Sequence, residues 1–139
     1  MSAVITRAEA RPKYRVSMVE LLILAVGATT VNSALYFTGM SAGASFNVTG
    51  APIDEISYAL VGAASFVPIL LMGTIALYLG WLKPSILPAA RWIGVIVALG
   101  SIASSYIATD SFAAGTWLGL MHVVSAIAWF LAIGRTSAH

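Results

Sequence analysis

The chain has 139 residues, of which 60% are hydrophobic and only 9% are charged, whereas a soluble domain carries about 25% charged residues. Its 7 Lys and Arg and 5 Asp and Glu side chains are too few to cover a soluble surface, and a net charge of +2 does not indicate a nucleic-acid partner. The absence of cysteine excludes disulfides and thiol chemistry. Composition therefore predicts an integral membrane protein surrounded by the lipid bilayer.

Four apolar stretches follow a basic tail at residues 1–17, and each is long enough to cross a hydrocarbon core of about 30 Å. A backbone in lipid must satisfy its own hydrogen bonds, and these stretches do not alternate polar with apolar residues, so we expect helices and not a barrel. The sequence predicts an all-α, antiparallel four-helix membrane bundle over residues 18–135 and a short tail at 136–139. The predicted spans are residues 21–38, 56–82, 92–109 and 112–134.

The basic residues predict the orientation of these spans. The 7 Lys and Arg side chains lie in the first tail, in the connection between the second and third spans, and after the fourth span. The first connection has no Lys or Arg but contains Asp54 and Glu55, and the third contains Asp110. The positive-inside rule therefore places both termini in the cytoplasm. We expect a multi-pass protein of the plasma (inner) membrane.

The first two spans each place a polar side chain among apolar ones. Asn32 shares a helical face with Ala28 and Tyr36 in the first span. The connection that follows, from residue 39 to 55, is rich in small residues, and both a flexible loop and a short re-entrant segment fit it. In the second span, Ser65 lies near Pro68, which we expect to kink the helix.

The third span follows a turn in which Pro84 and Pro88 are expected to break the helix on either side. Small and polar residues gather on one side of the third span: Gly94, Ser101, Ser104 and Ser105.

In the fourth span, Gly115 and Gly119 form a small-xxx-small pair, which lets another helix approach closely. Together with Gly94, they are predicted to be helix-packing positions. His122 lies on the same face as this pair, so we expect its ring to bond Asn32 or a serine of the third span. Trp129 lies deep in the span, and we expect it to pack within the bundle.

The polar side chains lie at similar depths, roughly 18–21 Å from the cytoplasmic ends for most of them at 1.5 Å per residue. The predicted polar layer consists of Asn32, Ser65, Ser101, Ser104, Ser105 and His122. One interpretation is a site for a small solute, a proton or a lipid headgroup. The other is a set of hydrogen bonds that hold the helices in register, each contributing about 0.6 kcal/mol. The lack of a carboxylate at this depth favours the second interpretation.

No catalytic, cofactor-binding or metal-binding residues are predicted. Haem ligation by two histidines would need a partner for His122 at its own depth, and His139 lies at the extreme end of the chain. Zinc would need more nitrogen, sulfur or oxygen ligands close together. Without a nucleophile or a carboxylate pair, we do not expect an enzyme.

Short segments in all four spans resemble an uncharacterised family of small four-span membrane proteins common in actinobacteria. The matching segments are Val31–Tyr36, Val61–Ser65, Ser101–Ser104 and Leu120–Val124. The resemblance implies the four-span architecture and draws attention to Asn32 and His122, but it implies no activity.

Two functions fit these observations. The first is a non-enzymatic accessory or structural subunit that binds another membrane protein, or a second copy of itself, through small-residue helix faces. The alternative is a component of a channel or transporter for a small solute, ion or proton, which would use the polar layer.

Overall fold

The computed structural model describes residues 17–48 and 52–134, and within them the regular secondary structure is four α-helices. These are α1 (Met18–Ser41), α2 (Tyr58–Leu82), α3 (Ile86–Ala108) and α4 (Phe112–Gly134). Each is long and apolar enough to cross a membrane. The prediction of an all-α fold with four candidate spans is confirmed. Apart from Ser17, the tails predicted at 1–17 and 136–139 lie outside the described residues.

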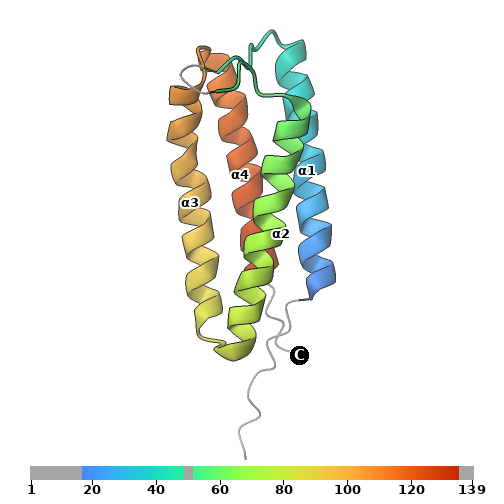
Figure 1. The fold of residues 1–139 in the computed structure, drawn as a ribbon, viewed down its shortest axis with the longest axis vertical. Helices are drawn as coiled ribbons and strands as arrows, with labels where there is room; N and C mark the ends of the chain where they lie inside the picture. The colour runs from blue at the N-terminus through green and yellow to red at the C-terminus, as the bar shows by residue number, and fades with distance from the viewer. Residues whose placement is uncertain (1–16, 49–51, 135–139) are drawn as a thin grey trace, which may run out of the picture.

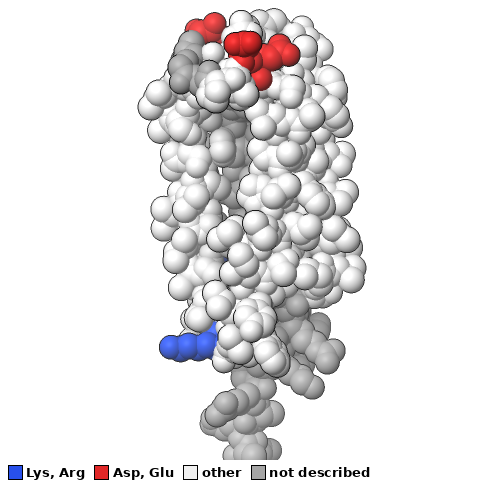
Figure 2. Space-filling model, in the orientation of Figure 1, with Lys and Arg blue, Asp and Glu red and all other residues white. Residues whose placement is uncertain are grey.

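The four helices lie side by side, and the chain changes direction at each connection (Figure 1). The α1–α2 and α3–α4 connections lie at one end, and the α2–α3 turn lies at the other. Figure 2 shows acidic side chains at the first of these ends and a basic side chain at the second. We call them the acidic end, which carries Asp54, Glu55 and Asp110, and the basic end, which carries Lys83.

Local hydrogen bonds explain why α1 begins three residues before the predicted span. The Ser17 hydroxyl accepts a hydrogen bond from the Val19 amide over 3.2 Å, and the Glu20 carboxylate accepts one from the Ser17 amide over 3.4 Å. This reciprocal arrangement is a capping box, which satisfies amides that have no partner inside the helix.

The third helix begins at Ile86, six residues before the predicted start. Pro88 was expected to lie outside the helix, but it lies in the first turn of α3. The amides of a first turn have no partner within the helix, so a proline there removes no hydrogen bond. The expected helix break therefore occurs only around Pro84.

The connection between α1 and α2 is folded against the acidic end of the bundle. Phe46 is only 6% exposed, and its ring lies 4.8 Å from that of Tyr36, measured between centroids. The Val48 amide donates to the Asp54 carbonyl and the Ile56 amide to the Phe46 carbonyl, over 2.9 and 2.8 Å. The described part of this connection is therefore fixed against the acidic end by the Phe46 side chain and by backbone hydrogen bonds.

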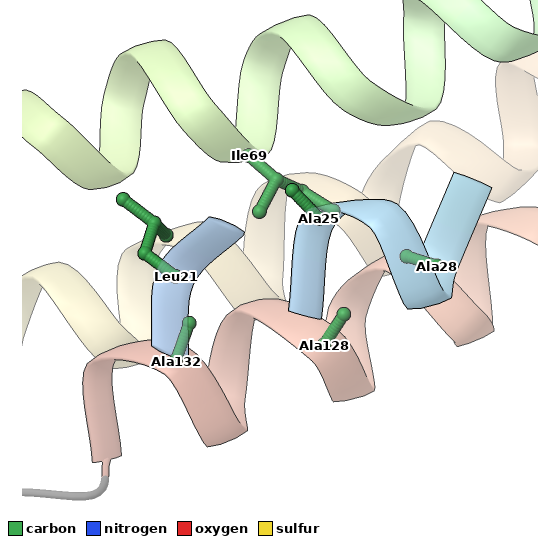
Figure 3. Close-up of a cluster of buried hydrophobic side chains, with 6 residues drawn as sticks. All are labelled: Leu21, Ala25, Ala28, Ile69, Ala128 and Ala132. Atoms are coloured by element: carbon green, nitrogen blue, oxygen red, sulfur yellow. The ribbon is translucent and has the colours of Figure 1, made fainter. Parts of the chain in front are cut away.

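Small residues let α1 approach α2 and α4 closely near the basic end. The cluster in Figure 3 joins Leu21, Ala25 and Ala28 of α1 to one residue of α2 and two of α4. Leu21 is fully buried and lies directly against Gly73 of α2, where an added Cβ would come within 2.9 Å of Leu21 Cδ2. Alanine and glycine at these contacts allow the helix backbones to come near one another.

Trp129 joins α4 to α3 near the basic end. Its indole N–H donates to the carbonyls of Ala90 and Arg91, both over 3.1 Å. Its ring lies against Gly94, which leaves no room for a side chain there. Arg91 also contacts α4, with its guanidinium carbon 3.4 Å from the centroid of the Phe130 ring. Trp129 therefore packs within the bundle, as expected.

The other two predicted packing glycines also lie at the α3–α4 contact. A Cβ added at Gly115 would lie 2.6 Å from Tyr106 Cδ1, and one added at Gly119 would lie 3.2 Å from Ile102 Cγ2. These glycines of α4 are therefore covered by side chains of α3 within the same chain.

The second and third helices meet at the basic end, where Leu87 of α3 packs against Gly80 of α2. From this turn they diverge toward the acidic end, and α4 is visible between them (Figure 1). As a result α3 is packed chiefly on α4 and has only two buried residues, Leu87 and Ser105.

Candidate functional site

A cavity of about 780 Å³ lies between α2 and α3. Residues of these two helices form its sides, and residues of α4 form its floor. The cavity opens between α3 and α2, where the space-filling view in Figure 2 shows a hollow. The cavity exists because the two helices are joined by a tight turn at one end and diverge toward the other.

Most of the cavity wall is apolar. The apolar wall residues of α2 include Leu60, Ile69, Met72, Ile75 and Leu79, and those of α3 include Ile86, Ile93 and Val97. No Asp, Glu, Lys or Arg is among the described residues that line it. The wall therefore suits a molecule, or part of one, that is soluble in lipid.

All six residues of the predicted polar layer line this cavity: Asn32, Ser65, Ser101, Ser104, Ser105 and His122. They come from all four helices, and Asn32 is the one contributed by α1. The sequence-based prediction thus named residues that the fold brings to one place. It did not predict the cavity, because the divergence of α2 and α3 has no signal in the spacing of residues.

Asn32 connects three helices through one side-chain amide. It is 1% exposed, and its Nδ2 group donates to Ser65 Oγ of α2 over 2.8 Å and to Ser125 Oγ of α4 over 3.1 Å. Each serine hydroxyl in turn donates to a carbonyl of its own helix, at Val61 and Met121. The hydrogens of the amide and of both hydroxyls are therefore all used.

The other end of the same amide has no partner. Asn32 Oδ1 is buried and accepts no hydrogen bond from any residue that the structure describes. A buried acceptor left in this state costs about 1–3 kcal/mol. Such atoms are uncommon in folded proteins, and a bound molecule or water is one reason for them.

The three serines of α3 are satisfied within their own helix. Ser101 donates to the Val97 carbonyl over 2.8 Å, and Ser104 and Ser105 both donate to the Ser101 carbonyl, over 2.6 and 3.4 Å. They make the wall more polar at this depth but do not link α3 to another helix.

His122 differs from its expected role. Its side chain is half-buried at the cavity wall. Among residues 17–48 and 52–134 it makes no side-chain hydrogen bond, neither to Asn32 nor to a serine of α3. The α4 side chain that bonds Asn32 is Ser125 and not His122. Sequence reasoning did not identify Ser125. Ser125 lies three residues after His122, so the shared helical face was the available signal.

Pro68 also lines the cavity, and α2 continues through it from Tyr58 to Leu82. The kink expected there stays a prediction. Across the described ranges, no group of three or more His, Asp or Glu side chains is placed to hold a metal ion. The site is therefore built from hydrogen-bonding groups in an apolar wall.

These features define a small protein of four membrane-length helices with a cavity between α2 and α3. The chain belongs to DUF6069, a family of unknown function, whose model matches residues 10–139. No curated protein and no solved structure matches the chain. The family agrees with the predicted resemblance to a group of proteins without assigned activity, and the actinobacterial origin stays a prediction.

Proposed function

We propose that this protein is an antiparallel four-helix bundle of the plasma (inner) membrane with both termini in the cytoplasm. The support comes from four apolar helices of sufficient length and from the separation of acidic and basic connections (Figure 2). The basic end would face the cytoplasm, as the positive-inside rule requires.

We further propose that the protein is not an enzyme and that it binds an apolar or amphipathic molecule drawn from the bilayer. The observation that carries this proposal is the cavity between α2 and α3, which has an apolar wall and a small group of polar residues. Sites for small ligands commonly have volumes of about 300–1,000 Å³ and this combination of wall residues. Both helices beside the opening carry many exposed apolar side chains, so a molecule in lipid can reach it.

Two neighbouring alanines of α2 provide the test. Ala64 lines the cavity, whereas Ala63 is exposed and does not. A long-chain alkyl probe carrying a photoreactive diazirine should label cavity residues of the purified protein in detergent, as mapped by mass spectrometry. Ala64→Phe should reduce this labelling at least fivefold, and Ala63→Phe should leave it unchanged. Equal labelling of both variants would contradict binding in the cavity.

The accessory or structural role remains a second candidate, with a different supporting observation. Gly115 and Gly119 are buried under side chains of α3, and Gly94 lies against Trp129 of the same chain. On α1, however, Gly27, Thr30 and Ala34 are exposed, and an added Cβ at Gly27 would meet nothing within 4 Å. Such small residues suit contact with a helix of a partner or of a second copy.

Disulfide formation tests contact between copies through this face, because the chain has no other cysteine. Ala34→Cys should give a covalent dimer in native membranes under mild oxidation, while Leu22→Cys, which is also exposed on α1 but points away from this face, should not. Failure of Ala34→Cys to form a dimer would exclude self-association through this face.

The channel or transporter alternative has less support. The cavity wall is apolar on both sides of the polar layer, with Leu60 and Leu118 toward the acidic end and Met72 and Leu79 toward the basic end. An ion or proton crossing the membrane would need polar groups along its whole path.

A further inference from the structure

We infer that the cavity binds an uncharged amphiphile through a hydroxyl group that donates a hydrogen bond to Asn32 Oδ1. This inference rests on the proposed binding function and names the chemical class of the ligand. Long-chain alcohols and monoacylglycerols belong to this class.

The hydrogen bonds around Asn32 show that the ligand must supply a donor. The amide hydrogens are used by Ser65 and Ser125, and the hydroxyl hydrogens of these serines are used by carbonyls of their own helices. Asn32 is one of the residues that line the cavity, and its buried Oδ1 is an acceptor without a partner among the described residues. A ligand that can only accept hydrogen bonds leaves that atom without a partner.

The orientation of the amide follows from the same bonds. With Nδ2 and Oδ1 exchanged, the oxygen would face Ser65 and Ser125, and both hydroxyls would have to leave the carbonyls that they now bond. Two N–H groups would then be buried without a partner. Two unsatisfied donors cost more than one unsatisfied acceptor, so the amide keeps its oxygen free.

The wall also shows that the ligand's polar group is uncharged. No ionised side chain of the described residues lines the cavity. A carboxylate, phosphate or ammonium placed there would lose its hydration without gaining a partner of opposite charge, which is strongly unfavourable. A hydroxyl group avoids this cost because it carries no charge.

The volume of the cavity suits one small molecule with an apolar part. Its volume of about 780 Å³ is within the range of sites that hold one small molecule. Apolar residues continue from the polar layer toward the basic end, along Ile69, Met72 and Ile75 of α2. The alkyl chain would lie along these residues while the hydroxyl group stays at Asn32.

Matched photoreactive probes test the inference on the full-length protein in detergent. A diazirine-bearing long-chain alcohol is compared with its methyl ether, which has the same chain but cannot donate, and with the fatty acid of the same length. In the unaltered protein we expect about tenfold more cavity labelling by the alcohol than by the ether, because only the alcohol satisfies the buried acceptor. The ionised fatty acid should also label poorly.

Asn32→Leu should remove the preference, so that alcohol and ether label the cavity equally at the level of the ether. The fold should tolerate this change because both serine hydroxyls keep their carbonyl partners. Asn47→Leu is the matched control, since Asn47 is exposed in the α1–α2 connection and does not line the cavity. It should keep the tenfold preference.

The possible outcomes separate this inference from the proposed function. Equal labelling by alcohol and ether in the unaltered protein, or a preference for the ether, overturns the inference. If Ala64→Phe still blocks the labelling, the binding function stands without it. An absence of cavity labelling by every probe overturns both. The comparison of probes in the unaltered protein decides the matter even if Asn32→Leu fails to fold.

Discussion

Asn32 is the residue on which the polar layer depends. It was singled out as one of six polar residues at similar depth, but the structure gives it a role that the others lack. Its amide links α1 to α2 and α4 through Ser65 and Ser125, whereas the serines of α3 bond only within their own helix. Hydrogen bonds between helices in a membrane contribute about 0.6 kcal/mol each, so this residue holds register more than it adds stability.

The sequence drew attention to His122 and not to Ser125. The structure predicts that substitution of Ser125 lowers stability more than substitution of His122. His122→Leu should change stability by less than about 0.5 kcal/mol, because no hydrogen bond to a described residue is lost. Ser125→Ala should cost about 0.6–1.5 kcal/mol, because one amide hydrogen of Asn32 loses its acceptor. Thermal unfolding in detergent measures both. A larger loss for His122→Leu would show that its ring holds the helices together.

At the scale of helices, the α3–α4 contact depends on glycine to different degrees along its length. Gly115→Ala should destabilise the fold by about 1–3 kcal/mol, because its Cβ would lie 2.6 Å from the Tyr106 ring. Gly119→Ala should cost less, since Ile102 is 3.2 Å from the added atom and can move.

Gly100 is the control for these two substitutions. It lies on α3, and a Cβ added there would meet nothing within 4 Å. Gly100→Ala should be neutral or stabilise by up to about 1 kcal/mol through helix propensity. Equal effects of the three substitutions on the melting temperature would show that α3 and α4 are not in close contact.

The α1–α2 connection is expected to behave as part of the fold. Phe46→Ala should lower stability by about 3–5 kcal/mol, because this ring is buried against Tyr36 at the acidic end. Ile53→Ala in the same connection should have little effect, since Ile53 is 43% exposed. Thermal unfolding of the two variants tests whether this connection is packed on the bundle. A mild effect of Phe46→Ala would indicate a loose loop.

At the scale of the whole molecule, the orientation proposed for the membrane can be measured with single cysteines. Ser45 and Ser85 are both exposed and lie in connections at opposite ends of the bundle. Ser45→Cys should react with a membrane-impermeant maleimide in intact cells, and Ser85→Cys should react only after the cells are opened. Equal labelling of both in intact cells would contradict the proposed topology.

The existence and type of all four helices could be predicted from sequence, but five of their eight ends differ from the prediction, by one to six residues. The fourth helix has the predicted bounds, whereas α1 begins earlier because of the Ser17–Glu20 capping box. The start of α3 was misplaced because Pro88 was interpreted as a helix breaker, although a first turn accepts proline. Hydropathy measures which residues are apolar enough for lipid, and it contains little information about helix ends.

By itself, the sequence determined that this chain forms four apolar helices with its charges at their ends, because a backbone in lipid must bond within its own helix. It also determined which polar residues share one depth, since the rise per residue of a helix is constant. Only the tertiary structure decided that Ser125 and not His122 bonds Asn32, that the glycines of α4 are covered by α3, and that α2 and α3 enclose a cavity. These features depend on how each helix is rotated and tilted against its neighbours, which side-chain packing among all four helices sets together.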